Sequence, residues 1–156
     1  MQVSIRSALQ DDAGRITEIY LESRKMFLSY APLVHSDREV GQWIAEELIP
    51  GDVAVAEISG RIVGFLATSR KGGASWIDHL YLSPESVARG VGTKLLRHAM
   101  SSLPPPIRLY AFQQNSGGRR FCERFGFRLV ALGDGSDNEE ICPDALYEFT
   151  SDGDGA

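Results

Sequence analysis

Residues 80–96 read LYLSPESVARGVGTKLL, and this stretch decides how the rest of the chain is interpreted. The apolar residues that begin it end a predicted strand, and the leucines that close it start the apolar face of a helix. Between them, Gly90 and Gly92 allow the backbone to approach a ligand closely. The first N–H groups of a helix have no partner within it, so together with the helix dipole they favour an anion. The stretch therefore predicts a turn that can hold a phosphate group.

Two better-known phosphate motifs do not fit this stretch. The P-loop pattern Gly-x-x-x-x-Gly-Lys-[Ser/Thr] is not satisfied. A dinucleotide-binding turn would need a third glycine and a repeated β-α-β setting, and both are missing. On its own, a Gly-x-Gly turn before a helix is as often structural as functional, so a second motif is needed.

The surrounding sequence alternates between strand-like and helix-like patterns. Ser36 with Glu39 matches a capping box at the start of one helix, and residues 59–61 read as a hairpin turn. The order β-α-α-β-β-β-α-β-α-β-β predicts an α/β (α+β) layered protein with a mixed sheet. Strands are expected at 3–6, 53–58, 62–68, 76–82, 107–112, 127–132 and 145–149. Four helices are expected: one that follows the capping residues 10–12, one that starts at residue 36, and two at 95–103 and 116–125.

The second motif lies further along the chain, where residues 115–127 read NSGGRRFCERFGF. Together the two motifs resemble those of the GNAT superfamily of N-acetyltransferases. That family has a strand ending Leu-Tyr-Val-x-Pro, then [Gln/Arg]-x-x-Gly-x-[Gly/Ala] opening a helix, and later Asn-x-x-Ala-x-x-Phe-Tyr-Glu-x-x-Gly-Phe. The resemblance extends from Ile5 to Phe149, and residues 134–140, DGSDNEE, are similar to a loop of one bacterial subgroup.

The resemblance implies both a fold and a cofactor site. The fold is a GNAT-like mixed, splayed β-sheet of about seven strands flanked by about four helices. Acetyl-CoA would lie between the parallel strands 76–82 and 107–112, with its pantetheine on the first strand and its pyrophosphate on the turn; no metal is implied. The residues expected to bind it are Leu80, Tyr81, Leu82, Ala88, Arg89, Gly90, Val91, Gly92, Thr93 and Asn115.

The chain departs from the family pattern in two places. Val87 stands where Gln or Arg is usual and Ala88 where a further glycine is common, so we expect a changed cofactor affinity. Cys122 stands at the position of a tyrosine often assigned as the acid that protonates the leaving thiolate. A cysteine is shorter, with a reference pKa of ~8.5 against ~10. Cys122 is therefore either that acid or a small buried apolar residue of a helix.

Acetylation of an amine also requires a proton acceptor and donors for the developing oxyanion. The backbone of residues 80–82 is the expected donor segment, and the candidate bases are Asp78, His79 and His35. Asp78 and His79 are neighbours on a strand, so only one would face the acceptor unless a bulge intervenes. His35 precedes the capped helix, in the region where this superfamily builds its acceptor pocket. The sequence leaves all three open.

Composition limits the other classes of function. The chain has 156 residues, so we expect one acetyltransferase domain at 1–150 and a disordered polar tail at 151–156. No apolar run approaches the ~20 residues of a membrane span, and the N-terminus does not read as a signal peptide, so a cytoplasmic protein without a membrane partner is expected. The net charge of −5 argues against nucleic acid as a partner.

These patterns predict an acetyl-CoA-dependent N-acetyltransferase that acts on a primary amine of a small molecule or peptide by direct attack on the thioester. Three alternatives stay open: a CoA-binding module without catalysis, an interaction protein on the same scaffold, and an enzyme that uses a longer acyl-CoA. The sequence determines neither the acceptor nor whether the protein is a monomer or a homodimer.

Overall fold

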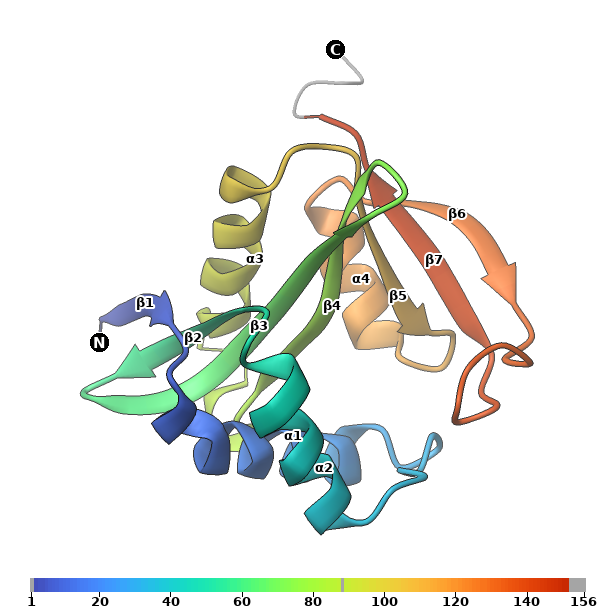
Figure 1. Ribbon diagram of the computed structural model, residues 1–156. Coiled ribbons are helices and arrows are strands. Elements are labelled where there is room, and N and C mark those ends of the chain that lie inside the picture. Colours follow the sequence, from blue (N-terminus) through green and yellow to red (C-terminus); the bar gives the residue numbers. More distant parts are fainter. Residues whose placement is uncertain (1, 88, 152–156) are drawn as a thin grey trace.

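The structure, a computed structural model, describes residues 2–87 and 89–151 of the chain. Within these residues seven strands form one mixed sheet in the order β1-β2-β3-β4-β5-β7-β6, with α-helices on both faces (Figure 1). The strands are β1 (Val3–Ser7), β2 (Asp52–Ile58), β3 (Arg61–Lys71), β4 (Ala74–Leu82), β5 (Ile107–Phe112), β6 (Arg128–Gly133) and β7 (Asp144–Phe149). The α-helices are α1 (Ala13–Phe27), α2 (Asp37–Trp43), α3 (Val91–Ser102) and α4 (Ser116–Arg124).

The predicted fold class and element order are confirmed, with small shifts at the element ends. β3 and β4 are longer than predicted because Gly72 and Gly73, at φ of 61° and 77°, allow a tight turn between them. The predicted hairpin at 59–61 is present, with Ser59 and Gly60 both at positive φ. The predicted Ala88 contact, and residues 152–156 of the predicted tail, lie outside the described residues.

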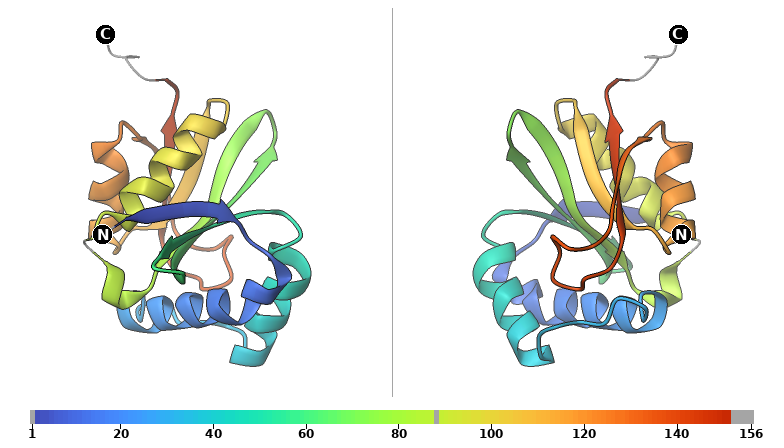
Figure 2. Two further views of the ribbon diagram at one scale, coloured as in Figure 1. Left: turned by 90° about the vertical axis from the view of Figure 1, so that its left-hand side faces the viewer. Right: turned by 90° about the vertical axis from the view of Figure 1, so that its right-hand side faces the viewer.

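Two hydrophobic cores lie on opposite faces of the sheet because successive strand residues point to opposite sides. On β3, Phe65 and Ala67 pack with α1 and α2, whereas Leu66 packs with α3 and β5. Figure 2 shows α1 and α2 on one side of the sheet and α3 and α4 on the other. The sheet is therefore a central layer between two helical layers.

The helix starts follow local signals. The Ser36 side chain accepts a hydrogen bond from the Glu39 N–H, and the Glu39 carboxylate accepts one from the Ser36 N–H, so the predicted capping box is confirmed. The helix α3 begins after Gly90, which has a φ of 81° and offers no side chain to the first N–H groups. These N–H groups are left for a ligand or solvent.

The sheet splays open in its middle. β4 and β5 are parallel and pair only at Ser75–Ile77 with Ile107–Leu109, after which the two strands diverge (Figure 1). The remaining half of β4 stays paired with β3 on its other side. Backbone N–H and C=O groups of residues 78–82 thus have no ladder partner on the β5 side, and a ligand can pair with them.

Candidate active site

A cavity of about 650 Å³ occupies the splay between β4 and β5. Its walls come from α1, α3, α4, from both splayed strands, and from β6 with the loop that follows it. Six of the predicted site residues line it together: Asp78, His79, Leu80, Tyr81, Asn115 and Cys122. These residues come from two stretches that lie far apart in the sequence, residues 78–81 and residues 115–122, and the fold brings both to one place.

A β-bulge explains how two neighbouring residues of β4 both reach the cavity. Ala67 of β3 is opposite His79, but the next residue, Thr68, is opposite Ile77, which leaves Asp78 as the extra residue on β4. A bulge of this kind interrupts the alternation of side chains. Asp78 is exposed at the cavity and His79 is partly buried beside it. Both side chains therefore reach the cavity, whereas in a regular strand only one of the two would face it.

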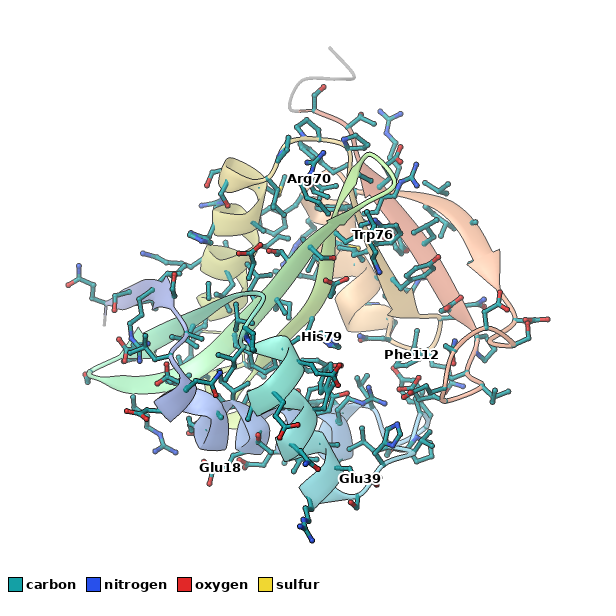
Figure 3. The ribbon with its side chains drawn as sticks, viewed as in Figure 1. Glu18, Glu39, Arg70, Trp76, His79 and Phe112 are labelled. Carbon is teal, nitrogen blue, oxygen red and sulfur yellow. The ribbon has the colours of Figure 1, made fainter. Side chains whose placement is uncertain are left out.

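His79 sits among aromatic rings. Its ring centroid lies 5.3 Å from that of Trp43, 6.0 Å from that of Tyr20 and 6.1 Å from that of Tyr81. Burial lowers the pKa of His79 below its usual value, although the carboxylate of Asp78 opposes the shift. The imidazole is therefore neutral at pH 7 and able to accept a proton. Figure 3 places His79 on β4 and Phe112 on β5, on the two sides of the splay.

Arg24 is a buried cation in the cavity wall that the sequence interpretation missed. Only 5% of its side chain is exposed, and Nη2 donates to the Ala31 carbonyl at 2.8 Å and to the Glu140 carboxylate at 2.9 Å. Its guanidinium also lies 5.8 Å and 5.6 Å from the ring centroids of Tyr20 and Phe112. A signal existed: Arg24 follows Tyr20 by four residues, on the apolar face of α1.

Carboxylates outnumber cations along the cavity. Among the described residues that line it, Arg24 is the one lysine or arginine. Glu140, which belongs to the loop between β6 and β7, is paired with it. The other acidic side chains in the wall are Asp78, Asp134, Asp137 and Asp144. The cavity therefore carries a net negative charge, which favours a positively charged ligand.

Cys122 lies where α4 meets both the cavity and the core. Its side chain is buried, and Sγ donates to the Arg119 carbonyl at 3.3 Å. Burial raises the pKa of the thiol to about 11. Cys122 therefore stays protonated at neutral pH and is a weak acid.

Asn115 has a structural role as well as its place in the cavity wall, and the other predicted residues are not among those that line the cavity. Asn115 caps α4, since its side-chain oxygen accepts from the Gly118 N–H at 3.0 Å. Arg89 and Gly90 precede α3, and Val91, Gly92 and Thr93 are its first residues. Neither residues 89–93 nor Leu82 are among those that line the cavity. His35 is also not among them: it is exposed, and its Nε2 lies 3.3 Å from Glu139 Oε1.

The comparison with protein families identifies the chain. The model of the acetyltransferase (GNAT) domain matches residues 50–129, just over half of the chain. The chain belongs to this family. The matched region includes the first motif and the splayed strands. The predicted family, and with it the class of acetyl-CoA-dependent N-acetyltransferases, is confirmed.

Individual relatives of this GNAT chain are distant. An uncharacterised N-acetyltransferase of Methanocaldococcus jannaschii is 25% identical over 138 residues, which cover 80% of this chain and 60% of that protein. The spermine/spermidine N(1)-acetyltransferase of Bacillus subtilis is 24% identical over 142 residues, covering 83% of this chain and 90% of that protein. The crystal structure of the PaiA N-acetyltransferase from Thermoplasma acidophilum, in complex with coenzyme A, has a TM-score of 0.71. It is 22% identical, over 96% of this chain and 100% of that one, and so supports the fold.

Two further features of the GNAT chain bear on its partners. No helix in the described residues is long and apolar enough to cross a membrane. Nor do three or more His, Cys, Asp or Glu side chains gather into a possible metal site within the described part of the chain.

Proposed function

We propose that this GNAT protein transfers the acetyl group of acetyl-CoA to a primary amine on an acceptor that carries at least one further positive charge. The observation that carries the proposal is the excess of carboxylates over cations in the cavity wall. An ammonium group near several carboxylates is stabilised by their field, more so where the walls exclude water. The Bacillus subtilis relative, whose name gives spermine and spermidine as its substrates, has acceptors of this chemistry.

Three features of this chain fit acetyl-CoA as the donor. The half of β4 that faces the splay offers backbone groups to an extended ligand. The start of α3 offers N–H groups and a positive helix end to a phosphate. A Cβ added to Gly90 would have no atom within 4 Å, so the backbone there is open to an approaching ligand. Acetyl-CoA supplies the activated acetyl thioester, and the β4 backbone can donate to the carbonyl oxygen.

His79 is our candidate for the proton acceptor. It lines the cavity, burial keeps it neutral, and the neighbouring Asp78 adds a negative charge that favours an ammonium group before reaction. The ammonium first loses one proton to solvent, because only the neutral amine has a lone pair that can attack the thioester. As that nitrogen bonds to the acetyl carbon its remaining N–H becomes acidic, and the imidazole can take this second proton. Cys122 is a weak candidate acid, because a pKa of about 11 makes proton donation to an ordinary thiolate unfavourable. We therefore propose that solvent, and not Cys122, protonates the coenzyme thiolate when the C–S bond breaks.

If carboxylates of the cavity wall bind the acceptor, two acidic residues of the loop between β6 and β7 should affect the KM for the acceptor differently. Both side chains are exposed, but Asp137 lines the cavity, whereas Glu139 is not among the lining residues and contacts His35. Asp137→Asn should raise the KM for spermine about fivefold, since one favourable charge interaction near the surface is lost. Glu139→Gln, the matched control, should leave it nearly unchanged. Release of free thiol from acetyl-CoA measures both rates.

A panel of acceptors tests the same proposal without mutation. Spermine, spermidine and butylamine differ in the number of positive charges, and glutamate carries a net negative charge. We expect kcat/KM to fall in that order and to weaken with added salt for the polycations. Equal activity on butylamine and spermine would show that the carboxylates do not select the acceptor.

The cofactor site predicts a difference between two variants of Gly90. Asparagine tolerates a positive φ and has nearly the size of aspartate, so Gly90→Asn and Gly90→Asp strain the backbone alike. The aspartate adds a negative charge beside the proposed pyrophosphate site and should raise the KM for acetyl-CoA about tenfold over Gly90→Asn. Without ligand, Gly90→Asp should be at least as stable as Gly90→Asn, because a negative charge is favourable at a helix N-terminus.

Thermal unfolding with acetyl-CoA separates this proposal from its alternatives. Ligand at ~100 times its dissociation constant adds about 2.7 kcal/mol of stability. Binding without turnover on any amine would favour a CoA-binding module. Absence of binding would favour an interaction protein.

We also propose that residues 1–150 act as a single acetyltransferase domain, that the protein is cytoplasmic, and that it forms a homodimer. Cell fractionation tests the location. The surface proposed to form the dimer is the exposed edge of the sheet, which is described below.

A further inference from the structure

The strand β6 is an unprotected edge of the sheet. It is last in the strand order, and within residues 2–87 and 89–151 its one neighbouring strand is β7. Its residues from Arg128 to Leu132 are all exposed, although side chains alternate between the two faces of a strand. The described part of the chain therefore covers neither face of this strand. Leu129, Val130 and Leu132 are 45%, 55% and 59% exposed.

Natural proteins usually block such an edge. Lysines, prolines, inward-pointing charges and β-bulges are the common devices. Within residues 129–133, LVALG, there is no charge and no proline, and the bulge at Val130 is the one device present. A bulge twists the strand but leaves its apolar side chains uncovered. An exposed edge with apolar side chains on both faces is a template for another strand.

Charges at the two ends of the strand indicate which strand it fits. Arg128 begins β6 and Asp134 follows its last residue. In the described structure neither Arg128 nor Asp134 has an ion-pair partner, and the Asp134 carboxylate accepts a hydrogen bond from the Ser136 N–H at 2.9 Å. If a second β6 ran antiparallel about a two-fold axis at Ala131, each Arg128 would be opposite the partner copy's Asp134. Val130 would then lie opposite Leu132 of the other copy, so the same register pairs opposite charges and apolar groups.

We propose that the edge of β6 binds a second copy of this chain, with the two β6 strands antiparallel about a two-fold axis. Two-fold interfaces use the same patch on both copies, and a strand with opposite charges at its ends is complementary to itself in this arrangement. Ala131, Leu132, Gly133 and Asp134 also line the cavity, so the second copy would lie along one wall of the site. The interface does not depend on which acceptor the enzyme uses.

The test is the oligomeric state, measured by light scattering after gel filtration and by sedimentation across a concentration series. The wild-type protein should be a dimer at micromolar concentration. Val130→Lys places a charge on the exposed edge and should raise the dimer dissociation constant more than about 100-fold. Met26→Lys, the matched control, makes the same charge change at a side chain 63% exposed on α1 and should leave the dimer intact.

A charge reversal tests the register itself. Arg128→Asp alone and Asp134→Arg alone each place like charges opposite one another, and each should weaken the dimer about tenfold. The double variant restores opposite charges in reversed order and should recover most of the affinity. A monomeric wild type would overturn the proposal, as would a dimer that Val130→Lys does not weaken. If the double variant did not recover the dimer affinity, the antiparallel register would be overturned. If the protein formed larger open assemblies, the two-fold arrangement would be overturned.

Discussion

Replacing His79 by glutamine is expected to lower kcat about 100-fold, at the lower end of what a positioned general base contributes. Glutamine keeps a similar size and a hydrogen-bonding side chain but cannot accept a proton at neutral pH. The KM for acetyl-CoA should change little, because the proposed cofactor contacts on β4 use the backbone. Steady-state release of the coenzyme thiol at saturating acceptor measures the effect.

The pH dependence gives this prediction a second readout. Burial lowers the pKa of His79 below its usual 6.5, so the imidazole is neutral and active above that value and protonated and inactive below it. In the wild-type enzyme kcat should therefore rise through an acid limb below pH 6.5 and then become level. In His79→Gln this acid limb should disappear, and kcat should stay at its lowered value across the pH range.

The neighbouring Asp78 provides the control, because the bulge brings both side chains to the cavity. Asp78→Asn removes a charge without removing the imidazole, so it should raise the KM for a cationic acceptor and keep the acid limb. If Asp78→Asn abolishes the limb and His79→Gln keeps both kcat and the limb, the roles of the two residues are reversed. If neither variant alters the profile, the proton leaves through water.

Local features of the fold were predictable from the sequence because their causes are local. Ser36 and Glu39 satisfy each other's backbone within three residues, and Gly60 permits the turn between two apolar runs. The first motif predicted both the end of β4 and the start of α3, since a strand, a glycine turn and a helix each leave a pattern in a short window. The GNAT family followed from two such windows in the correct order.

The features that the sequence did not predict depend on distant parts of the chain. Asp78 is the extra residue of a bulge only because of how β3 pairs with β4, and nothing near Asp78 indicates this register. The ion pair of Arg24 with Glu140 joins residues 116 positions apart. His35 was a reasonable candidate from its place before α2, but the loop after β6 brings Glu139 to it. A candidate active site can therefore be outlined from motifs, while its charge pattern requires the structure.

The buried ion pair leads to the largest expected effect on stability. Arg24→Met should lower the free energy of unfolding by about 3 kcal/mol, because the Glu140 carboxylate, 15% exposed, is left without its cation. The substitution also removes the guanidinium from between the rings of Tyr20 and Phe112. For a chain of this size such a loss lowers the melting temperature by about 6–12 °C. Urea unfolding and thermal unfolding both measure it.

Two controls separate the charge from the packing. In Arg24→Met with Glu140→Gln no charge is left buried, so the double variant should be more stable than either single variant. Lys25, the next residue, forms an ion pair with Asp37 in which both side chains are more than half exposed, and Lys25→Met should have little effect. A double variant as unstable as the sum of the singles would mean that Arg24 stabilises α1 through packing and its bond to Ala31. The loop between β6 and β7 would then be held by other contacts, and the carboxylates it presents to the cavity would not depend on Arg24.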